Sequence, residues 1–488
     1  MSLKRAAVRL VAGCAALAAI SGCAPPGAPR APGTIQVDLE TSPTSTDPRL
    51  ATDATSSRVN ELVFDSLVKV ARDGSYENHL AEGVERPSGT EIVFHLRHGV
   101  RFSDGRTFSA RDVKYTYDWI LNPANLSAKR GGMNKLKSIS APDDYTVVMT
   151  TAEPYAPALE LATQGIVPFG TPGPAKISSP SPPGTGPFEM ASFARDESIH
   201  LRRNHYASAP PGTANDIIFK IVPDPTVQAL ELAEGVCDLS ENFVSPDVLG
   251  YLSSKPNLGV INAPGTSFQY LAFNFHDARL RDIRVRRAIA YAIDRKAIVQ
   301  GMLRDTARVA TGMLAPENWA YAEDVTAYPY DPEQAGRLLD AAGYPAGPGG
   351  VRNLRFVYKT TPDGARLAEA IQAMLARIGV KIDIRSNEWA AFYADIQNGN
   401  FDLMSSRWIG VNDPSQYYFI FDSKMTPPRG YNRGNYSNPA MDHLVENGMS
   451  TLAPQERKKI YAQVQGLAAD DLPYVPLWWI DTVVVLNR

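Results

Sequence analysis

Hydrophobic and polar positions follow two periodicities along this chain, and each periodicity predicts one kind of secondary-structure element. Short apolar or alternating stretches predict strands, whereas apolar residues three and four positions apart predict helices. Strands are expected at 34–39, 91–96, 145–150, 188–193, 199–202, 217–222, 270–274, 355–358, 380–384 and 475–479. Helices are expected at 60–70, 110–121, 227–233, 283–303, 331–343, 365–378 and 456–467.

The order of these elements indicates the fold class. Strands alternate with helices, which favours βαβ units and a largely parallel sheet. A chain of 488 residues is too long for one typical domain. Residues 170–187 are dense in Gly, Pro and Ser, which is typical of a long exposed connection or a boundary between subdomains. We therefore expect an α/β protein with two mixed lobes.

Local signals mark some element ends. Ser109 stands where a helix N-cap belongs, and Asp112 follows three positions later as a variant of the capping box. The sequence Ser103-Asp104-Gly105 predicts a tight turn. These signals place a helix start at Ala110.

The N-terminus has the pattern of an export signal. Basic Lys4, Arg5 and Arg9 precede an apolar run of 11 residues at 10–20, which is shorter than the roughly 20 needed to span a bilayer. Ile-Ser-Gly-Cys at 20–23 then resembles a bacterial lipobox, in which cleavage exposes the cysteine for lipid attachment. We expect a signal peptide at 1–22, lipid on Cys23 and a Pro-rich tether at 23–33. An ordinary signal peptide with an accidental cysteine is the alternative.

Composition excludes some classes of protein. A net charge of −3 argues against a nucleic-acid binder, which needs a basic surface. Of the three cysteines, Cys14 leaves with the signal and Cys23 carries lipid, so Cys237 has no partner for an intramolecular disulfide. We expect Cys237 to be a buried small hydrophobe, with a reactive thiol as the alternative.

Catalytic motifs are missing from the sequence. It contains no Gly-x-Ser-x-Gly elbow, no His-Glu-x-x-His pair and no Cys-x-x-Cys site. His95 and His98 would point to opposite faces of a strand, which makes them a poor metal pair. We therefore expect no catalytic residue, no metal and no cofactor, and we regard a secreted hydrolase as the least favoured class.

Six motifs in order carry a family resemblance. They are Phe-His-Leu-Arg-His-Gly-Val-Arg-Phe-Ser-Asp-Gly at 94–105 with Ala-Arg-Asp-Val at 110–113, Gly-Thr-Gly-Pro-Phe at 184–188, Asp-Ile-Arg-Val-Arg-Arg-Ala-Ile at 282–289 with Tyr-Ala-Ile-Asp-Arg at 291–295, Tyr-Asp-Pro-Glu-Gln-Ala at 330–335 with Leu338-Leu339 and Ala-Gly-Tyr at 342–344, Phe401-Asp402 with Trp408, and Asp413-Pro414 with Tyr-Ser-Asn-Pro at 436–439 and Glu456-Arg457. Over roughly Thr34 to Trp478 the chain resembles the family 5 extracellular solute-binding proteins, the oligopeptide- and dipeptide-type receptors of ABC importers.

The resemblance implies a two-lobe periplasmic-binding-protein fold of type II, with a hinge between the lobes and an extra subdomain in the first. Lobe I would comprise 34–271 and 475–488, with the extra subdomain at 60–184. Lobe II would comprise 272–474. The hinge crossings would fall near 270–274 and 474–477.

The resemblance also suggests where a ligand would bind. In the peptide-binding relatives the segment around Trp408 is an edge strand, and an aspartate shortly after the tryptophan holds the ligand's amino group. Val411 or Asn412 stands at that position here, and Asp413 could take over if the loop shifts. The candidate ligand-binding residues are Ser42, Thr44, Arg407, Trp408, Ile409, Gly410, Asn412, Asp413 and Tyr417. Arg407 could equally form a surface ion pair, and Trp408 and Tyr417 could equally pack in a core.

We therefore expect a substrate-binding lipoprotein of an ABC importer, exported to the periplasm or outer cell face and anchored to a membrane by lipid. It would act as a monomer, capture a small solute, foremost a peptide, and deliver it to a permease and its ATPase. An anchored sensor on the same fold, or a binder of an oligosaccharide or metal chelate, is the alternative. The importer receptor and the sensor would share this fold and differ only in the protein with which each works.

Overall fold

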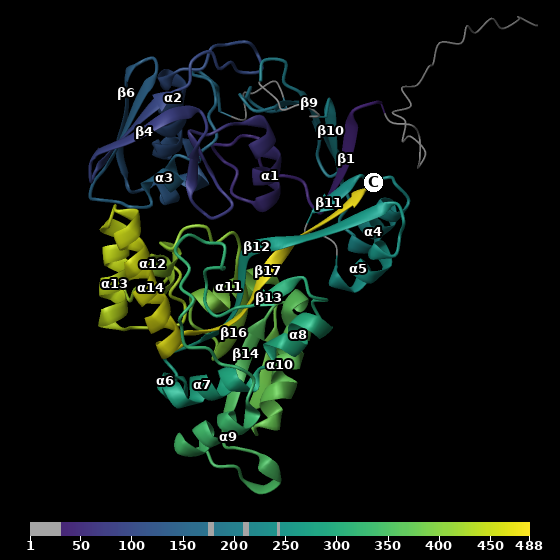
Figure 1. Cartoon of the computed structure of the whole chain (residues 1–488), viewed down its shortest axis with the longest axis vertical. Coiled ribbons are helices and arrows are strands. Elements are labelled where there is room, and N and C mark those ends of the chain that lie inside the picture. The colour runs from purple at the N-terminus through teal and green to yellow at the C-terminus, as the bar shows by residue number, and fades with distance from the viewer. Residues whose placement is uncertain (1–30, 174–179, 208–213, 242–244) are drawn as a thin grey trace, which may run out of the picture.

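The computed structural model describes residues 31–173, 180–207, 214–241 and 245–488. A large mixed β-sheet runs through the centre of the molecule (Figure 1). The strands of this sheet are β1 (Thr34–Leu39), β8 (Phe188–Ala194), β9 (Ser198–Arg203), β10 (Asp216–Ile221), β11 (Leu239–Glu241), β12 (Leu258–Phe273), β13 (Ala307–Val309), β14 (Arg355–Thr360), β15 (Lys381–Ser386), β16 (Leu403–Trp408) and β17 (Tyr474–Asn487). Among the described residues they are ordered β15-β14-β16-β12-β17-β11-β1-β10-β9-β8, and β13 pairs with β17.

Two long antiparallel strands, β12 and β17, lie in the middle of this sheet. The first half of β12 pairs with the last half of β17, from Leu258 opposite Asn487 to Ala263 opposite Thr482. After an irregularity between Ala263 and Ser267, the pairing continues to the other end of both strands. The same two strands therefore run through both halves of the sheet and connect them.

Helices cover both faces of the half that contains β16, β14 and β15. Along β12, Phe268 and Tyr270 point to one face and Leu271 and Phe273 to the other, as the alternation of a strand requires. The first face packs against α11 (Trp389–Gln397), α12 (Gln416–Phe421), α13 (Pro439–Ser450) and α14 (Pro454–Asp471), and the second against α7 (Ile283–Ala292), α8 (Arg295–Gly301), α9 (Pro332–Ala341) and α10 (Ala365–Arg377). A short helix, α6 (Ala278–Arg281), precedes α7.

The half on the other side of β17 contains β11, β1, β10, β9 and β8. One core cluster joins this sheet to α1 (Ala54–Val63), and a second joins it to α4 (Pro225–Ala233) and α5 (Pro246–Ser253). Cys237 is fully buried in the second cluster, which confirms the interpretation of a small buried hydrophobe. Burial raises the pKa of its thiol, so the reactive thiolate is disfavoured.

A separate small sheet lies at the upper left of Figure 1. Its strands, in the order β4-β5-β7-β6, pack with α2 and α3 around their own core. The elements are β4 (Ala81–Ser88), β5 (Glu91–Leu96), β6 (Leu136–Asp143), β7 (Thr146–Thr151), α2 (Ala110–Leu121), α3 (Ala158–Leu161) and a hairpin of β2 (Val68–Val70) and β3 (Tyr76–Asn78). The end of α13 touches this subdomain, where the Ala156 amide donates to the Met449 carbonyl at 2.7 Å.

Three expectations from the sequence are wrong. The helix expected at 60–70 is α1, which spans Ala54–Val63. It begins earlier because the Asp53 side chain caps it, accepting a hydrogen bond from the Ser56 amide at 2.8 Å. Residues 68–70 form the strand β2 instead. The helix expected at 283–303 is two helices, since Ile293 is extended and Asp294 caps α8. The sheet is mixed and not largely parallel, because the central pair and the outer pairs β8–β9 and β9–β10 are antiparallel.

The expected signal peptide, Cys23 and most of the tether lie outside the described residues. Within the described ranges, no helix combines the length and apolar character that crossing a membrane requires.

Candidate ligand-binding site

The carboxyl end of β16 carries the tryptophan that the sequence singles out. β16 runs parallel to β14, with Leu403 opposite Tyr358, so Trp408 lies at the carboxyl end of a parallel pair. Ligands of α/β sheets bind outside such ends, so this edge of the sheet is a candidate ligand-binding surface.

One edge of β16 is open next to Trp408. β16 pairs with β12 along its whole length, from Leu403 opposite Phe273 to Trp408 opposite Phe268. On its other side it pairs with β14 through Leu403 and Met404. Beyond Met404, no backbone hydrogen bond joins this edge to another described segment. An extended chain can add to an edge of this kind by strand pairing.

The Trp408 ring is half-buried between two tyrosines. It stacks on Tyr270, with ring centroids 6.0 Å apart and 13° between the planes, and its centroid lies 5.3 Å from that of Tyr431. Its indole Nε1 is buried and has no hydrogen-bond partner in the described structure. The ring is therefore packed on one side while its polar group stays unsatisfied.

The loop after Trp408 turns back towards β12. Gly410 has a φ of +62°, a conformation that favours glycine, and the Val411 amide donates to the Thr266 carbonyl at 3.1 Å. This turn leaves Ile409 68 % exposed at the tip. Ile409 is an apolar side chain that a ligand at the open edge would meet.

Asn412 connects this loop to the subdomain above. Its backbone carbonyl accepts from the Asn318 side-chain amide at 2.6 Å, and its own side-chain oxygen accepts from the Thr266 hydroxyl at 3.4 Å. The same carbonyl lies against Gly74 of the β2–β3 turn, where a Cβ atom would come within 2.3 Å of it. Asn412 thus supports the loop through contacts within the protein.

Asp413 is a partner of Arg457. Its two oxygens accept from the guanidinium at 2.7 and 2.9 Å, and one of them also accepts from the Ser415 amide at 2.8 Å. Burial alone would raise the pKa of Asp413, but the ion pair and the Ser415 hydrogen bonds hold it below its ordinary value. Both oxygens are engaged, so we do not retain this carboxylate as the partner of a ligand's ammonium group.

Arg407 and Tyr417 have opposite surroundings. Arg407 is exposed and forms no ion pair with a described residue, so its guanidinium is free to meet an anion. Tyr417 is 1 % exposed, its hydroxyl accepts from the Met313 amide at 3.3 Å, and its ring packs near Phe421. These contacts are those of a core residue.

Ser42 and Thr44 lie in the loop after β1. The Ser42 hydroxyl accepts from the Asp196 amide at 2.7 Å, and the Thr44 hydroxyl donates to Asp53, the cap of α1. No hydrogen bond joins either residue to the Trp408 loop within the described structure. Trp408 to Asp413 thus lie along one loop, whereas Ser42 and Thr44 belong to a different loop, and their role towards a ligand stays a prediction.

Residues that sequence reasoning missed surround Trp408. We call Tyr270, Trp408, Tyr431, Tyr474 and Arg433 the aromatic cage. The Tyr270 and Tyr474 rings stack 4.2 Å apart at 6°, and the Arg433 guanidinium carbon lies 5.3 Å from the Trp408 ring centroid. A signal for Arg433 was present, because no acidic residue occurs between Asp422 and Asp442 to pair with it locally.

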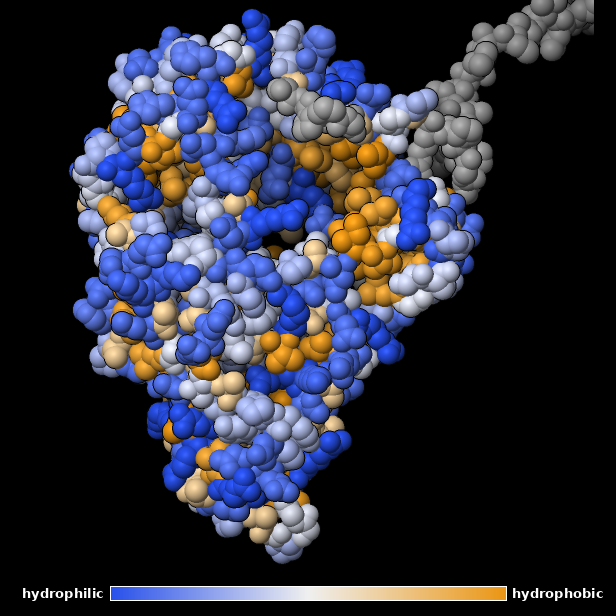
Figure 2. Space-filling view, in the orientation of Figure 1, coloured by the Kyte–Doolittle hydropathy of each residue, from blue (hydrophilic) through white to orange (hydrophobic). Residues whose placement is uncertain are grey.

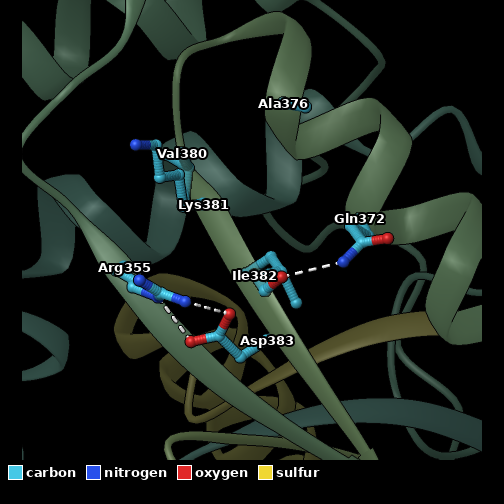
Figure 3. Close-up of a pocket in the computed structure, with 7 residues that line it drawn as sticks. All are labelled: Arg355, Gln372, Ala376, Val380, Lys381, Ile382 and Asp383. Atoms are coloured by element: carbon cyan, nitrogen blue, oxygen red, sulfur yellow. Dashed lines mark hydrogen bonds and ion pairs between the residues drawn. The ribbon is translucent and has the colours of Figure 1, made fainter.

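The pocket between α10 and β15 is a different kind of surface feature (Figure 3). There Arg355 and Asp383 form an ion pair across two strands, and the Gln372 side chain donates to the Ile382 carbonyl at 2.8 Å. These residues lie near the amino ends of β14 and β15, at the opposite end of the sheet from Trp408. Their polar groups already pair with each other, so we do not regard this pocket as the ligand site.

Figure 2 shows the surface hollowed in the middle of the molecule, between its upper and lower parts.

Among the described residues no group of three or more His, Cys, Asp or Glu side chains is arranged to hold a metal ion.

The chain is similar in sequence to proteins of known families. The model of the family described as bacterial extracellular solute-binding proteins, family 5 Middle, matches residues 75–426. A probable di/tripeptide-binding protein of Pseudomonas aeruginosa is 29 % identical to this chain, covering 92 % of the chain and 90 % of the relative. The heme-binding protein A of Haemophilus influenzae is 28 % identical, covering 89 % and 85 %.

A solved structure shows the same architecture. The ABC transporter-associated periplasmic binding protein DppA of Helicobacter pylori, in complex with a peptide, superposes with a TM-score of 0.76 and 27 % sequence identity. The match covers 93 % of this chain and 94 % of that one. The two-lobe α/β fold expected from the sequence is thereby confirmed, and these relatives are solute-binding proteins and not enzymes.

Proposed function

Because this chain belongs to the family 5 bacterial extracellular solute-binding proteins, we propose that it captures a short peptide and delivers it to an ABC importer. The open edge of β16 beside Trp408 carries this proposal. Strand addition recognises the backbone that all peptides share, whereas neighbouring side chains select among them. The peptide-binding relatives support the choice of ligand.

The two halves of the sheet act as the lobes that close on the ligand. We assign 34–271 and 475–488 to lobe I, with its extra subdomain at 60–184, and 272–474 to lobe II. Both crossings use β12 and β17, and we expect the bend at the register irregularity at 263–267, a few residues before the assigned boundary at 271. The ligand would stabilise the closed form, which the importer recognises.

The partners follow from this role. A permease and its ATPase receive the solute, and lipid on Cys23 holds the exported monomer to a membrane through the tether at 23–33. An anchored sensor would use the same closure with another membrane partner. Labelling with a radioactive fatty acid in the host, compared between the wild-type protein and Cys23→Ala, tests the anchor.

A carboxylate-bearing metal chelate is the second candidate ligand. The engagement of Asp413 by Arg457 favours it, because a peptide's ammonium group then lacks that carboxylate partner beside Trp408. The heme-binding relative supports this candidate.

Mass spectrometry of the protein purified from its native host tests the main proposal. The protein would be denatured, and the released compounds identified; short peptides are expected. Saturation of the emptied protein at about a hundred times the dissociation constant should then add roughly 2.7 kcal/mol to the free energy of unfolding. Release of a single metal chelate, with no stabilisation by any peptide pool, would replace peptide uptake by the second candidate.

A further inference from the structure

The aromatic cage holds an arginine without a counter-ion. Arg433 is 7 % exposed, its Nε is buried without a hydrogen-bond partner, and no described carboxylate pairs with it. The rings of Trp408, Tyr431 and Tyr393 surround it, with centroids 5.3, 5.6 and 5.5 Å from its guanidinium carbon. A desolvated cation of this kind is costly unless something pairs with it.

The other buried arginines show how unusual this is. Each of them has polar partners for its guanidinium group: Asp47 for Arg49, the Leu280 and Asp471 carbonyls for Arg286, the Pro476 carbonyl for Arg295, Asp340 for Arg352 and Asp413 for Arg457. Burial as such therefore does not leave an arginine unpaired in this protein. Arg433 differs from the rest of this set because of where it lies.

The neighbours of Arg433 add further buried polar groups. The Trp408 indole has no hydrogen-bond partner in the described structure, and the Tyr270 hydroxyl is buried beside the Arg433 guanidinium and the Tyr474 hydroxyl. Burial raises the pKa of both tyrosines, so their hydroxyl groups stay protonated and can donate. Indole and guanidinium groups can only donate. The cage thus gathers donors and a positive charge, and among the described residues its acceptors are neutral tyrosine hydroxyls, with no carboxylate.

The cage also reaches the surface. Tyr431 and Tyr393 are 39 % and 37 % exposed, and Trp408 is half-buried at the end of the open edge of β16. A ligand on that edge would therefore approach Arg433 past these three rings.

We propose that the aromatic cage is the subsite for a carboxylate of the bound ligand, with Arg433 as its counter-ion. A carboxylate accepts hydrogen bonds through both oxygens and matches the fork of an arginine, which is the pairing the cage lacks. An ammonium group would meet a like charge there. The inference rests on the proposed peptide function, and it gives the peptide an orientation: its C-terminus, or an acidic side chain, lies beside Trp408.

A competition experiment on the full chain tests the carboxylate subsite. The emptied protein is offered equal amounts of a tripeptide pool and the same pool with amidated C-termini, and the retained peptides are quantified by mass spectrometry. A second pair of amidated pools differs only in Glu against Gln at one position. Wild-type protein should retain the acid form at least tenfold over the neutral form in one pair, which also tells which carboxylate is bound.

Substitutions locate the preference. Arg433→Gln should bring the ratio to about one, whereas Arg433→Lys should keep part of it. Arg429→Gln, an exposed arginine of the same loop, should leave it unchanged. Arg433→Gln should also raise the unfolding temperature of the ligand-free protein, because it removes an unpaired buried charge. A ratio near one in wild type for both pairs, or a ratio that survives in Arg433→Gln, would overturn the assignment.

The two proposals fail in different ways. Retention of both forms without preference leaves peptide binding intact and removes the carboxylate subsite. Retention of no peptide removes the peptide function. In that case a mixture of small mono-, di- and tricarboxylic acids is offered instead, and the subsite is abandoned if none is retained or if Arg433→Gln retains them as well.

Discussion

At the scale of residues, the clearest result concerns Asp413 and Arg457. Their side chains form a bidentate pair that is almost wholly buried, across 44 positions of sequence. The carboxylate that could replace the family's ligand-binding aspartate if the loop shifted is thus engaged in an internal contact between the Trp408 loop and α14. Removing one member of such a pair leaves an uncompensated charge in the interior.

The substitution Asp413→Asn is expected to lower the free energy of unfolding by about 3–5 kcal/mol, because it leaves Arg457 buried without its counter-ion. Asp383→Asn is the matched control, since its partner Arg355 is 65 % exposed in its side chain, and it should cost less than about 1 kcal/mol. Urea unfolding measures both. Equal losses in the two variants would mean that the buried pair contributes no more than an exposed one.

Glu160 supplies a pH dependence. Glu160 is exposed to solvent, but nearby protein groups partly desolvate its carboxyl, and this desolvation, with the charge of Asp413, raises its pKa from 4.5 to about 7. The folded state therefore keeps a proton that the unfolded state releases, so this group's contribution to stability falls as pH rises from about 4.5 to about 7.

Thermal unfolding of the wild-type protein and Glu160→Gln between pH 5 and pH 8 tests this sign. The variant has no proton to lose, so its advantage over the wild-type protein should be small at pH 5 and larger at pH 8. A difference in unfolding temperature that stays constant over this range would contradict the raised pKa.

At the scale of elements, the start of α2 shows how a local signal becomes tertiary structure. One Asp112 oxygen accepts from the Ser109 amide at 2.7 Å, as the capping pattern predicts. The other oxygen accepts from the Phe169 amide at 2.7 Å, which ties the loop before 170 to the helix. The acid therefore caps a helix and holds a distant segment at once.

Asp112→Ala should therefore cost more than Ser109→Ala. The serine substitution keeps the backbone bond and is expected to cost about 1 kcal/mol or less. The aspartate substitution loses three charge-assisted hydrogen bonds, from the Ser109 amide, the Ser109 hydroxyl and the Phe169 amide, and should cost about 2–3 kcal/mol. Denaturant midpoints of the two variants, with the exposed Asp118→Ala on the same helix as control, decide the order. The reverse ranking would show that capping by the serine dominates.

Elements with local signals were predictable from the sequence, and those defined by remote pairing were not. β1, β5 and α2 have the predicted bounds, because the signals that define them lie in neighbouring residues: alternation of apolar and polar side chains for the strands and a capping pattern for the helix. β12 was expected at 270–274 but spans Leu258–Phe273, since its first half is recognised as a strand through pairing with β17. Trp408 was predicted from its motif, whereas the isolation of Arg433 depends on side chains brought together from several strands and loops.

At the scale of the whole molecule, two strands connect the lobes, so closure should be visible as a change of size. A compact chain of this length has a radius of gyration of about 23 Å. The emptied protein should exceed this value in small-angle X-ray scattering and approach it when the retained peptide pool is added. Calorimetric binding without any decrease in the radius would show that the ligand enters an already closed molecule.

The position of β17 in the chain also shapes how the protein is made. β17 follows β12 by about 200 residues, yet it is the central partner of that strand in both lobes. At a synthesis rate of roughly 5–20 residues per second, β12 waits about 10–40 s for its neighbour. The large sheet therefore stays incomplete until the last strand has been made, whereas the small subdomain, which has its own sheet and core, does not depend on β17.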